Sequence, residues 1–221
     1  MCGTGAMAVR AESGSLEGCD PLESRVCHCF ACTFVRAAGA VIEGEKPAAI
    51  FSVRIEPAGI PRGPQTRTAL RDAIRTYEVE FTLRGITLTT LGERSGRIQL
   101  LAYRPNLVAE VLGDPAACSF LRGLGYPVDN VAELMGTLRR HLAAYLRGER
   151  TPFPHEVGVV LGYPLEDVLG YMRGECETCR GPWRSYGDAR AAELRFMRVV
   201  RGERTCRERF ASGVTLDRLL A

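Results

Sequence analysis

The amino-acid sequence predicts an α+β fold with a small, largely antiparallel sheet, a central hairpin and several covering helices. Two short apolar, β-branched runs, Ile86–Leu91 and Arg97–Arg104, flank the turn-forming segment 92–96, as the strands of a hairpin do. Several longer segments carry apolar residues at three- and four-residue spacing, which indicates amphipathic helices. No repeat period is visible, which excludes a solenoid.

The N-terminal half is expected to contain two helices and a strand before the hairpin. Apolar residues recur at helical spacing in residues 21–38 and again from Leu70 to Phe81. Residues 48–55 are apolar and β-branched, as in a strand. Residues 56–65 contain three prolines and two glycines and should form a loop.

The C-terminal half is expected to be mostly helical. Asp114 before Pro115 is a helix-start signal, and Asn130 followed by Glu133 resembles a capping box. The apolar pattern behind Asn130 lasts for four turns, and that helix should pack on the sheet. Two short helices and a cysteine-bearing turn should follow at 155–161, 164–173 and 176–183. A last helix is expected to bury Ala192, Phe196, Val199 and Val200 on one face.

Length and composition favour one folded unit. The chain has 221 residues and 46% hydrophobic content, which is enough for one core and short for two full domains. We expect residues 1–20, which lack periodicity, to be a mobile leader and residues 21–221 to form a single α+β domain. No uninterrupted apolar stretch approaches the ~18 residues of a membrane helix, and the N-terminus does not have the pattern of an export signal. A cytoplasmic location without membrane contact is expected.

Charge and cysteine content restrict the classes of partner. The formal net charge is +3, and no basic run stands apart from acidic residues, so we expect no nucleic-acid binding. Charge and cysteine content do not exclude a protein partner. The nine cysteines are odd in number and should remain reduced in a chain without an export signal. They are candidates for packing, metal-binding or redox roles.

The first candidate site is a metal centre. In Cys27-His28-Cys29-Phe30-Ala31-Cys32, a helix places Cys29 beside Cys32, and likewise His28 beside Cys32. Thiolates and imidazoles are the ligand types for zinc, iron or copper. A second pair has the spacing of half a tetrahedral thiolate site or of a redox dithiol. The predicted ligands of zinc, iron or another thiolate-bound cofactor are His28, Cys29, Cys32, Cys176 and Cys179, with packing as the alternative role.

The second candidate site is catalytic and combines Lys46, His155 and Glu156. Lys46 is the only lysine in a chain rich in arginine, and an ammonium is a compact charge with a tunable pKa. His155 and Glu156 open an expected helix and would serve as acid and base if both faced a pocket. The zinc-protease pattern is absent, because the position of its second histidine is Val159. Surface exposure of Lys46 and a capping role for the pair are the alternatives.

A third candidate is a cofactor-stacking site. Trp183 is the only tryptophan, and it lies with Tyr186 after a Gly-Pro turn. Both rings would suit stacking on a planar cofactor or a base, and packing is the alternative. Phosphate-binding loops, nucleophile elbows and kinase catalytic loops are not found in the sequence.

One sequence run resembles a known family. The run FPHEVGVVLGYPLEDV at residues 153–168 is similar to the signature of a bacterial family, domain of unknown function 3793. Other segments fit the same resemblance: His28-Cys29, Lys46-Pro47-Ala48, Leu100-Leu101-Ala102-Tyr103-Arg104, Cys179-Arg180-Gly181-Pro182-Trp183 and Tyr186-Gly187-Asp188. The leader, the Pro-rich segment near 56–65 and the extra Cys27 and Cys32 depart from it. The resemblance implies small soluble proteins, mostly of anaerobic bacteria, with no agreed catalytic activity.

These observations lead to one favoured function and two alternatives. The favoured interpretation is that the chain is an uncharacterised cytoplasmic protein, and that it binds a metal or cofactor as an accessory protein in anaerobic redox or metal metabolism. A small enzyme with a pocket formed by Lys46, His155 and Glu156 is the first alternative. An interaction module without catalysis is the second.

Overall fold

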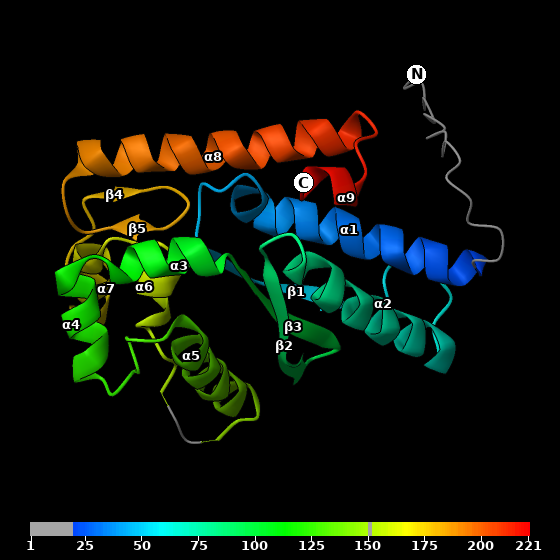
Figure 1. Cartoon of the computed structure of the whole chain (residues 1–221), viewed down its shortest axis with the longest axis horizontal. Helices are drawn as coiled ribbons and strands as arrows, with labels where there is room; N and C mark the ends of the chain where they lie inside the picture. Colours follow the sequence, from blue (N-terminus) through cyan, green and yellow to red (C-terminus); the bar gives the residue numbers. More distant parts are fainter. Residues whose placement is uncertain (1–19, 150–151) are drawn as a thin grey trace.

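The computed structural model describes residues 20–149 and 152–221. The predicted leader lies outside these ranges except for Asp20. The described chain forms a three-stranded antiparallel sheet with helices on both faces and a separate two-stranded hairpin (Figure 1). The predicted α+β class with a small antiparallel sheet is therefore confirmed.

The sheet is built around its third strand. β1 (Ala48–Arg54) and β2 (Thr87–Arg94) both pair antiparallel with β3 (Arg97–Tyr103), which lies in the middle. β2 and β3 form the predicted hairpin, and its turn has Ser95 and Gly96 at positive φ (51° and 70°). A register shift between Thr90 and Gly92 marks a β-bulge in β2.

Alternate residues of each strand belong to two different hydrophobic cores. Ala49, Phe51 and Val53 of β1 pack in the first core with Leu100 of β3. Ala48 and Leu101 pack in the second core. Successive side chains of a strand point to opposite faces, so a strand that is apolar throughout separates two cores.

Four helices cover the first face. They are α1 (Pro21–Ile42), α2 (Pro64–Thr82), α8 (Ala189–Ala211) and α9 (Leu216–Leu219). α1 runs between the sheet and α8 (Figure 1). The two helices approach closely at Gly39, where an added Cβ would lie 3.2 Å from the Cβ of Cys206. α9 was not predicted from the sequence.

α1 is longer and α8 is rotated relative to the expectations. α1 extends four residues beyond the predicted end, past a non-helical Ala38. Val200 of α8 is 47% exposed, contrary to its predicted place on the buried face. α8 instead buries Ala192, Phe196, Val199, Gly202 and Cys206. Neighbouring residues differ by about 100° around a helix, so Val199 and Val200 cannot both lie in one narrow contact stripe.

α1 also passes a length and composition test for membrane helices. It is the one helix in the described ranges long and apolar enough to cross a membrane, and 56% of its 18-residue apolar window is buried inside the structure. The core helix of a folded domain passes the same test, because it too is apolar on several sides.

The second face is covered by five shorter helices and the small hairpin. These elements are α3 (Pro105–Leu112), α4 (Pro115–Gly123), α5 (Val131–Leu146), α6 (Val157–Val160), α7 (Leu165–Arg173), β4 (Cys179–Arg180) and β5 (Arg184–Ser185). Asn130 caps α5 as expected, since its Oδ1 accepts hydrogen bonds from the backbone N–H groups of Ala132 and Glu133 at 2.9 and 3.2 Å. α3 was not predicted.

Arg104 joins the end of β3 to the end of α1. Its side chain donates to the carbonyl oxygens of Val41 and Ile42 at 2.7 and 2.6 Å, which are among the last carbonyls of α1. Its backbone N–H donates to the carbonyl of Pro47 at 2.9 Å. Burial lowers the pKa of the Arg104 guanidinium, and Glu43 opposes this change. The loop before β1 is thus fixed by β3.

The turn between α6 and α7 packs directly on this loop. Gly162 has φ +83°, and an added Cβ would lie 2.6 Å from Cδ of Pro47. Both the left-handed backbone and the close approach exclude a larger residue. Pro47 thereby sets how near α6 and α7 lie to the edge of β1.

Gly162→Ala should therefore destabilise the protein by about 1–3 kcal/mol, because alanine is strained at this φ and overlaps Pro47. Gly123→Ala in α4 is the matched control, since no atom lies within 4 Å of its Cβ position and its φ is not positive. That change should be neutral or stabilising by up to about 1 kcal/mol. Urea unfolding followed by circular dichroism measures both. Equal stabilities of the two variants would contradict the packing described.

Candidate functional site

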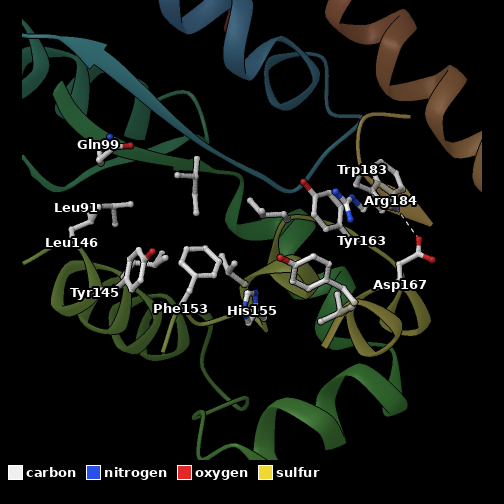
Figure 2. A pocket seen from close by; sticks show the side chains of 17 residues that line it. Leu91, Gln99, Tyr145, Leu146, Phe153, His155, Tyr163, Asp167, Trp183 and Arg184 are labelled. Atoms are coloured by element: carbon white, nitrogen blue, oxygen red, sulfur yellow. Dashed lines mark hydrogen bonds between the residues drawn. The ribbon is translucent and has the colours of Figure 1, made fainter. Parts of the chain in front are cut away.

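A cavity of about 650 Å³ lies on the second face of the sheet (Figure 2). Ile50, Leu91 and Gln99, one residue from each strand, form its floor. One wall is the end of α5, and the other comprises residues 153–163, α7 and the β4–β5 hairpin. Ligand pockets typically measure about 300–1,000 Å³ and are mostly apolar. This cavity has the size and lining of a site for a small organic molecule.

Aromatic rings surround the cavity in two groups. Tyr145, Phe153, His155 and Tyr171 form a chain of ring contacts with successive centroid distances of 5.1, 5.2 and 5.0 Å. The second group is Tyr163 and Trp183, which stack at 4.8 Å with an interplanar angle of 21°. Figure 2 shows Tyr145 at one end of the cavity and Trp183 at the other, with Phe153 and His155 between them. A planar molecule would find aromatic surface at both ends.

Asp167 holds the Trp183 end together. The residue is 3% exposed, and its carboxylate accepts four hydrogen bonds within the described ranges. The donors are Trp183 Nε1 at 2.8 Å, Ser185 Oγ at 2.9 Å, Tyr186 N at 2.7 Å and Gly187 N at 3.3 Å. Asp167 lies in the first turn of α7, where the helix dipole also favours negative charge. One carboxylate therefore fixes the indole and the hairpin against α7.

Of the two predicted stacking residues, Trp183 lines the cavity and Tyr186 does not. The Tyr186 ring packs on Gly170 of α7, where any Cβ would collide with it. Phe196 supports Trp183 in a T-shaped contact, with the ring centroids 4.6 Å apart. The two predicted residues are thus adjacent, but only the tryptophan is placed to touch a ligand.

Gln99 and His155 bring polar side chains to the cavity. Within the described ranges, neither the Gln99 amide nor the His155 imidazole makes a side-chain hydrogen bond, although both line the cavity. Their polar atoms are not sealed from solvent. Gln99 offers a donor and an acceptor, and neutral histidine also offers one of each. Neither Gln99 nor the cavity tyrosines were predicted from the sequence.

The predicted catalytic residues do not share this cavity. His155 lines it, but Glu156 turns away and accepts a 2.6 Å hydrogen bond from the Tyr126 hydroxyl. The same hydroxyl lies 2.9 Å from Nδ1 of His141, and since its single proton goes to Glu156, His141 must be the donor. Burial and the Glu156 carboxylate both raise the pKa of Tyr126. These hydrogen bonds from His141 through Tyr126 to Glu156 anchor the segment that carries His155.

Lys46 lies behind the cavity wall and not inside it. Its Nζ is 5.2 Å from the centroid of the Tyr163 ring, a cation–π distance. Burial lowers the pKa of this ammonium, and Glu203 opposes the effect. Within the described part of the chain, no carboxylate lies within ion-pair distance of Lys46.

The predicted metal ligands fall into two separate places. Nε2 of His28 lies 3.4 Å from Sγ of Cys32, whereas Cys29 packs against the first core. Sγ of Cys179 is 3.8 Å from the carbonyl of Ala189, and Cys176 is exposed. The N-terminal half of α1 and the β4–β5 hairpin lie at opposite ends of the molecule (Figure 1). In residues 20–149 and 152–221, no group of three or more His, Cys, Asp or Glu is arranged to hold a metal.

Asp167→Asn should destabilise the protein by about 2–3 kcal/mol. An amide has one acceptor oxygen, so its NH₂ group would face either the Trp183 N–H or the Ser185 and Tyr186 donors. Asp129→Asn is the control, because the Asp129 side chain is 90% exposed and its pair with Arg122 contributes little. Urea unfolding compares the two, and an unchanged midpoint for Asp167→Asn would contradict the role of the carboxylate.

Fold and cavity together define a helix-rich α+β protein with an aromatic pocket of small-molecule size. A family model described as Protein of unknown function (DUF3793) matches residues 34–220, and the chain belongs to this family. The resemblance seen in the sequence is thereby confirmed. No curated protein and no solved structure matches the chain. All strands and every cavity residue lie within the matched range, whereas the cysteines and histidine of residues 27–32 precede it.

Proposed function

We propose that this protein binds a planar, mostly apolar small molecule, of the kind that serves as a cofactor or metabolite. The observation that carries the proposal is the aromatic lining of the 650 Å³ cavity. Tyr163 and Trp183 supply ring faces, and the apolar floor supplies a dry surface for the body of the ligand. Gln99 and His155 are free to orient the polar edge of the ligand.

Cofactor binding is the part of the sequence-based function that the cavity supports. Metal ligation has no such support, because the cysteines occupy two separate places and their first group precedes the family match. A role in anaerobic redox or metal metabolism stays a prediction, as do the cytoplasmic location and the absence of nucleic-acid and membrane contacts. The proposal assigns no reaction, since His155 alone of the three suggested catalytic residues reaches the cavity.

The free energy that a ligand would gain in this cavity is in the range that micromolar binding requires. A bicyclic or tricyclic ligand that buries about 300 Å² of apolar surface gains roughly 7 kcal/mol from burial. Association costs at least about 4 kcal/mol, so stacking and the two polar contacts would have to supply the rest for micromolar affinity.

Trp183 reports directly on occupancy, because it is the only tryptophan and it lines the cavity. Titration with N-phenyl-1-naphthylamine, a neutral fluorophore with a planar naphthalene ring, should quench Trp183 by energy transfer with saturation at one probe per chain. Ile50→Phe should weaken binding about tenfold or more, because the larger ring occupies space above the floor.

Leu83→Phe is the matched control, since Leu83 is 84% exposed and does not line the cavity. Binding by this variant should equal that of the wild type. Absence of saturable quenching in the wild type would refute the proposed function. Equal affinities of the Ile50 and Leu83 variants would show that the probe binds elsewhere.

A further inference from the structure

The charged side chains around the cavity differ in how far they are already neutralised. Among the described residues that line it, Asp167 and Arg184 are the two with a full charge. Asp167 has four donors around its carboxylate, so little of its capacity remains for a ligand. Arg184 is different, because its guanidinium keeps most of its donors free.

Glu177 is the acidic neighbour of Arg184, but its carboxylate lies closer to Arg180. Nε of Arg184 lies 3.5 Å from Oε2 of Glu177. Arg180 Nη2 approaches the two oxygens of the same carboxylate at 2.6 and 2.9 Å. The hydrogen bond from Arg180 is also the main cause that lowers the pKa of Glu177. Within the described ranges, the Nη atoms of Arg184 make no hydrogen bond.

A second cation lies at the same end of the cavity. The half-buried Lys46 ammonium stands over Tyr163, which itself lines the cavity and stacks on Trp183. No described carboxylate pairs with it within 4 Å. Two cations with incomplete neutralisation therefore lie near one aromatic pair, and such a location favours an anion and disfavours a cation.

We infer that the ligand carries an anionic oxygen group, which Arg184 binds at the Tyr163–Trp183 end of the cavity. This inference rests on the proposed function. The ring system of the ligand lies over the apolar floor, and its carboxylate, sulfonate or phosphate points to the guanidinium. Arginine suits this role because its planar donors match two oxygens of such a group at once.

Two probes that differ by one sulfonate test the inference. 1-Anilinonaphthalene-8-sulfonate is the anionic counterpart of N-phenyl-1-naphthylamine, and both accept energy from Trp183. The wild type should bind the sulfonate about tenfold more tightly than the neutral probe. Arg184→Gln should remove this preference and leave the affinity for the neutral probe within about twofold.

Arg94→Gln is the matched control. Its guanidinium also lies over a cavity tyrosine, 5.9 Å from the Tyr145 centroid, but at the opposite end. Both probes should bind that variant as they bind the wild type. Loss of the sulfonate preference in Arg94→Gln and not in Arg184→Gln would overturn the assignment. Binding of the neutral probe without any preference for the sulfonate overturns this inference alone, whereas no binding of either probe overturns the proposed function as well.

Competition distinguishes the possible sources of the anionic group. 1-Naphthoate and 1-naphthyl phosphate share one ring system and differ in the acid. Displacement of the sulfonate probe by either compound, reduced in Arg184→Gln, supports the inference, and the stronger competitor identifies a carboxylic or a phosphorylated ligand. Failure of both compounds to displace the probe would contradict it.

Discussion

The buried carboxylate of Asp167 determines the position of most of the groups that surround the cavity. The β4–β5 hairpin has two residues in each strand, and a hairpin of that size has no independent stability in water. Its attachment to α7 comes through hydrogen bonds from Ser185, Tyr186 and Gly187 to this one side chain, and the Trp183 indole is fixed by the same group. Burying an unpaired carboxylate costs several kcal/mol, and hydrogen bonds to a charged group return about 1.5–3 kcal/mol each. Four such hydrogen bonds are enough to offset this cost, and they also define the geometry of the hairpin and of the indole.

The cavity itself follows from the dimensions of a three-stranded sheet. Strands lie about 4.8 Å apart, and a helix with its side chains is about 10 Å wide. α5 packs on β2 at one side of the second face, while the α6–α7 turn reaches β1 at the other side through Gly162 and Pro47. Between them the middle strand is left uncovered, and its residue at that point is Gln99. On the first face α1 and α2 lie side by side and fill the space with aromatic rings such as Phe34 and Phe81. A smaller pocket of about 280 Å³ remains among the described residues between α1, β1 and Leu70 of α2.

Local signals in the sequence predicted the fold well, and the site only in part. The hairpin and the start of α5 are specified by neighbouring residues, such as the glycines of the turn and the Asn130 cap. The sequence does not indicate α3 and α9, because short helices depend on tertiary contacts. In α3 only Val108 is buried. Trp183 was a reasonable candidate from its chemistry alone. That Gln99 and Tyr145 would line the same cavity could not be inferred, since this depends on how α5 and the hairpin pack on the sheet. Glu156 does not accompany His155 into the cavity, because residues adjacent in a tight turn point to different sides.

The distribution of charge around the cavity adds a selective element to a surface that would otherwise accept any flat apolar molecule. Hydrophobic burial and stacking are nearly indifferent to the identity of the ring system. A charged group changes this, because removing an anion from water is costly unless donors replace its hydration. Arg184 and Lys46 are located where they reduce that cost, and the same two charges raise it for a cation. Asp167, the one carboxylate on the wall, is screened by four donors and does not offset them. Selectivity in this protein would therefore come from the difference between the occupied carboxylate on α7 and the available guanidinium on the hairpin that this carboxylate anchors.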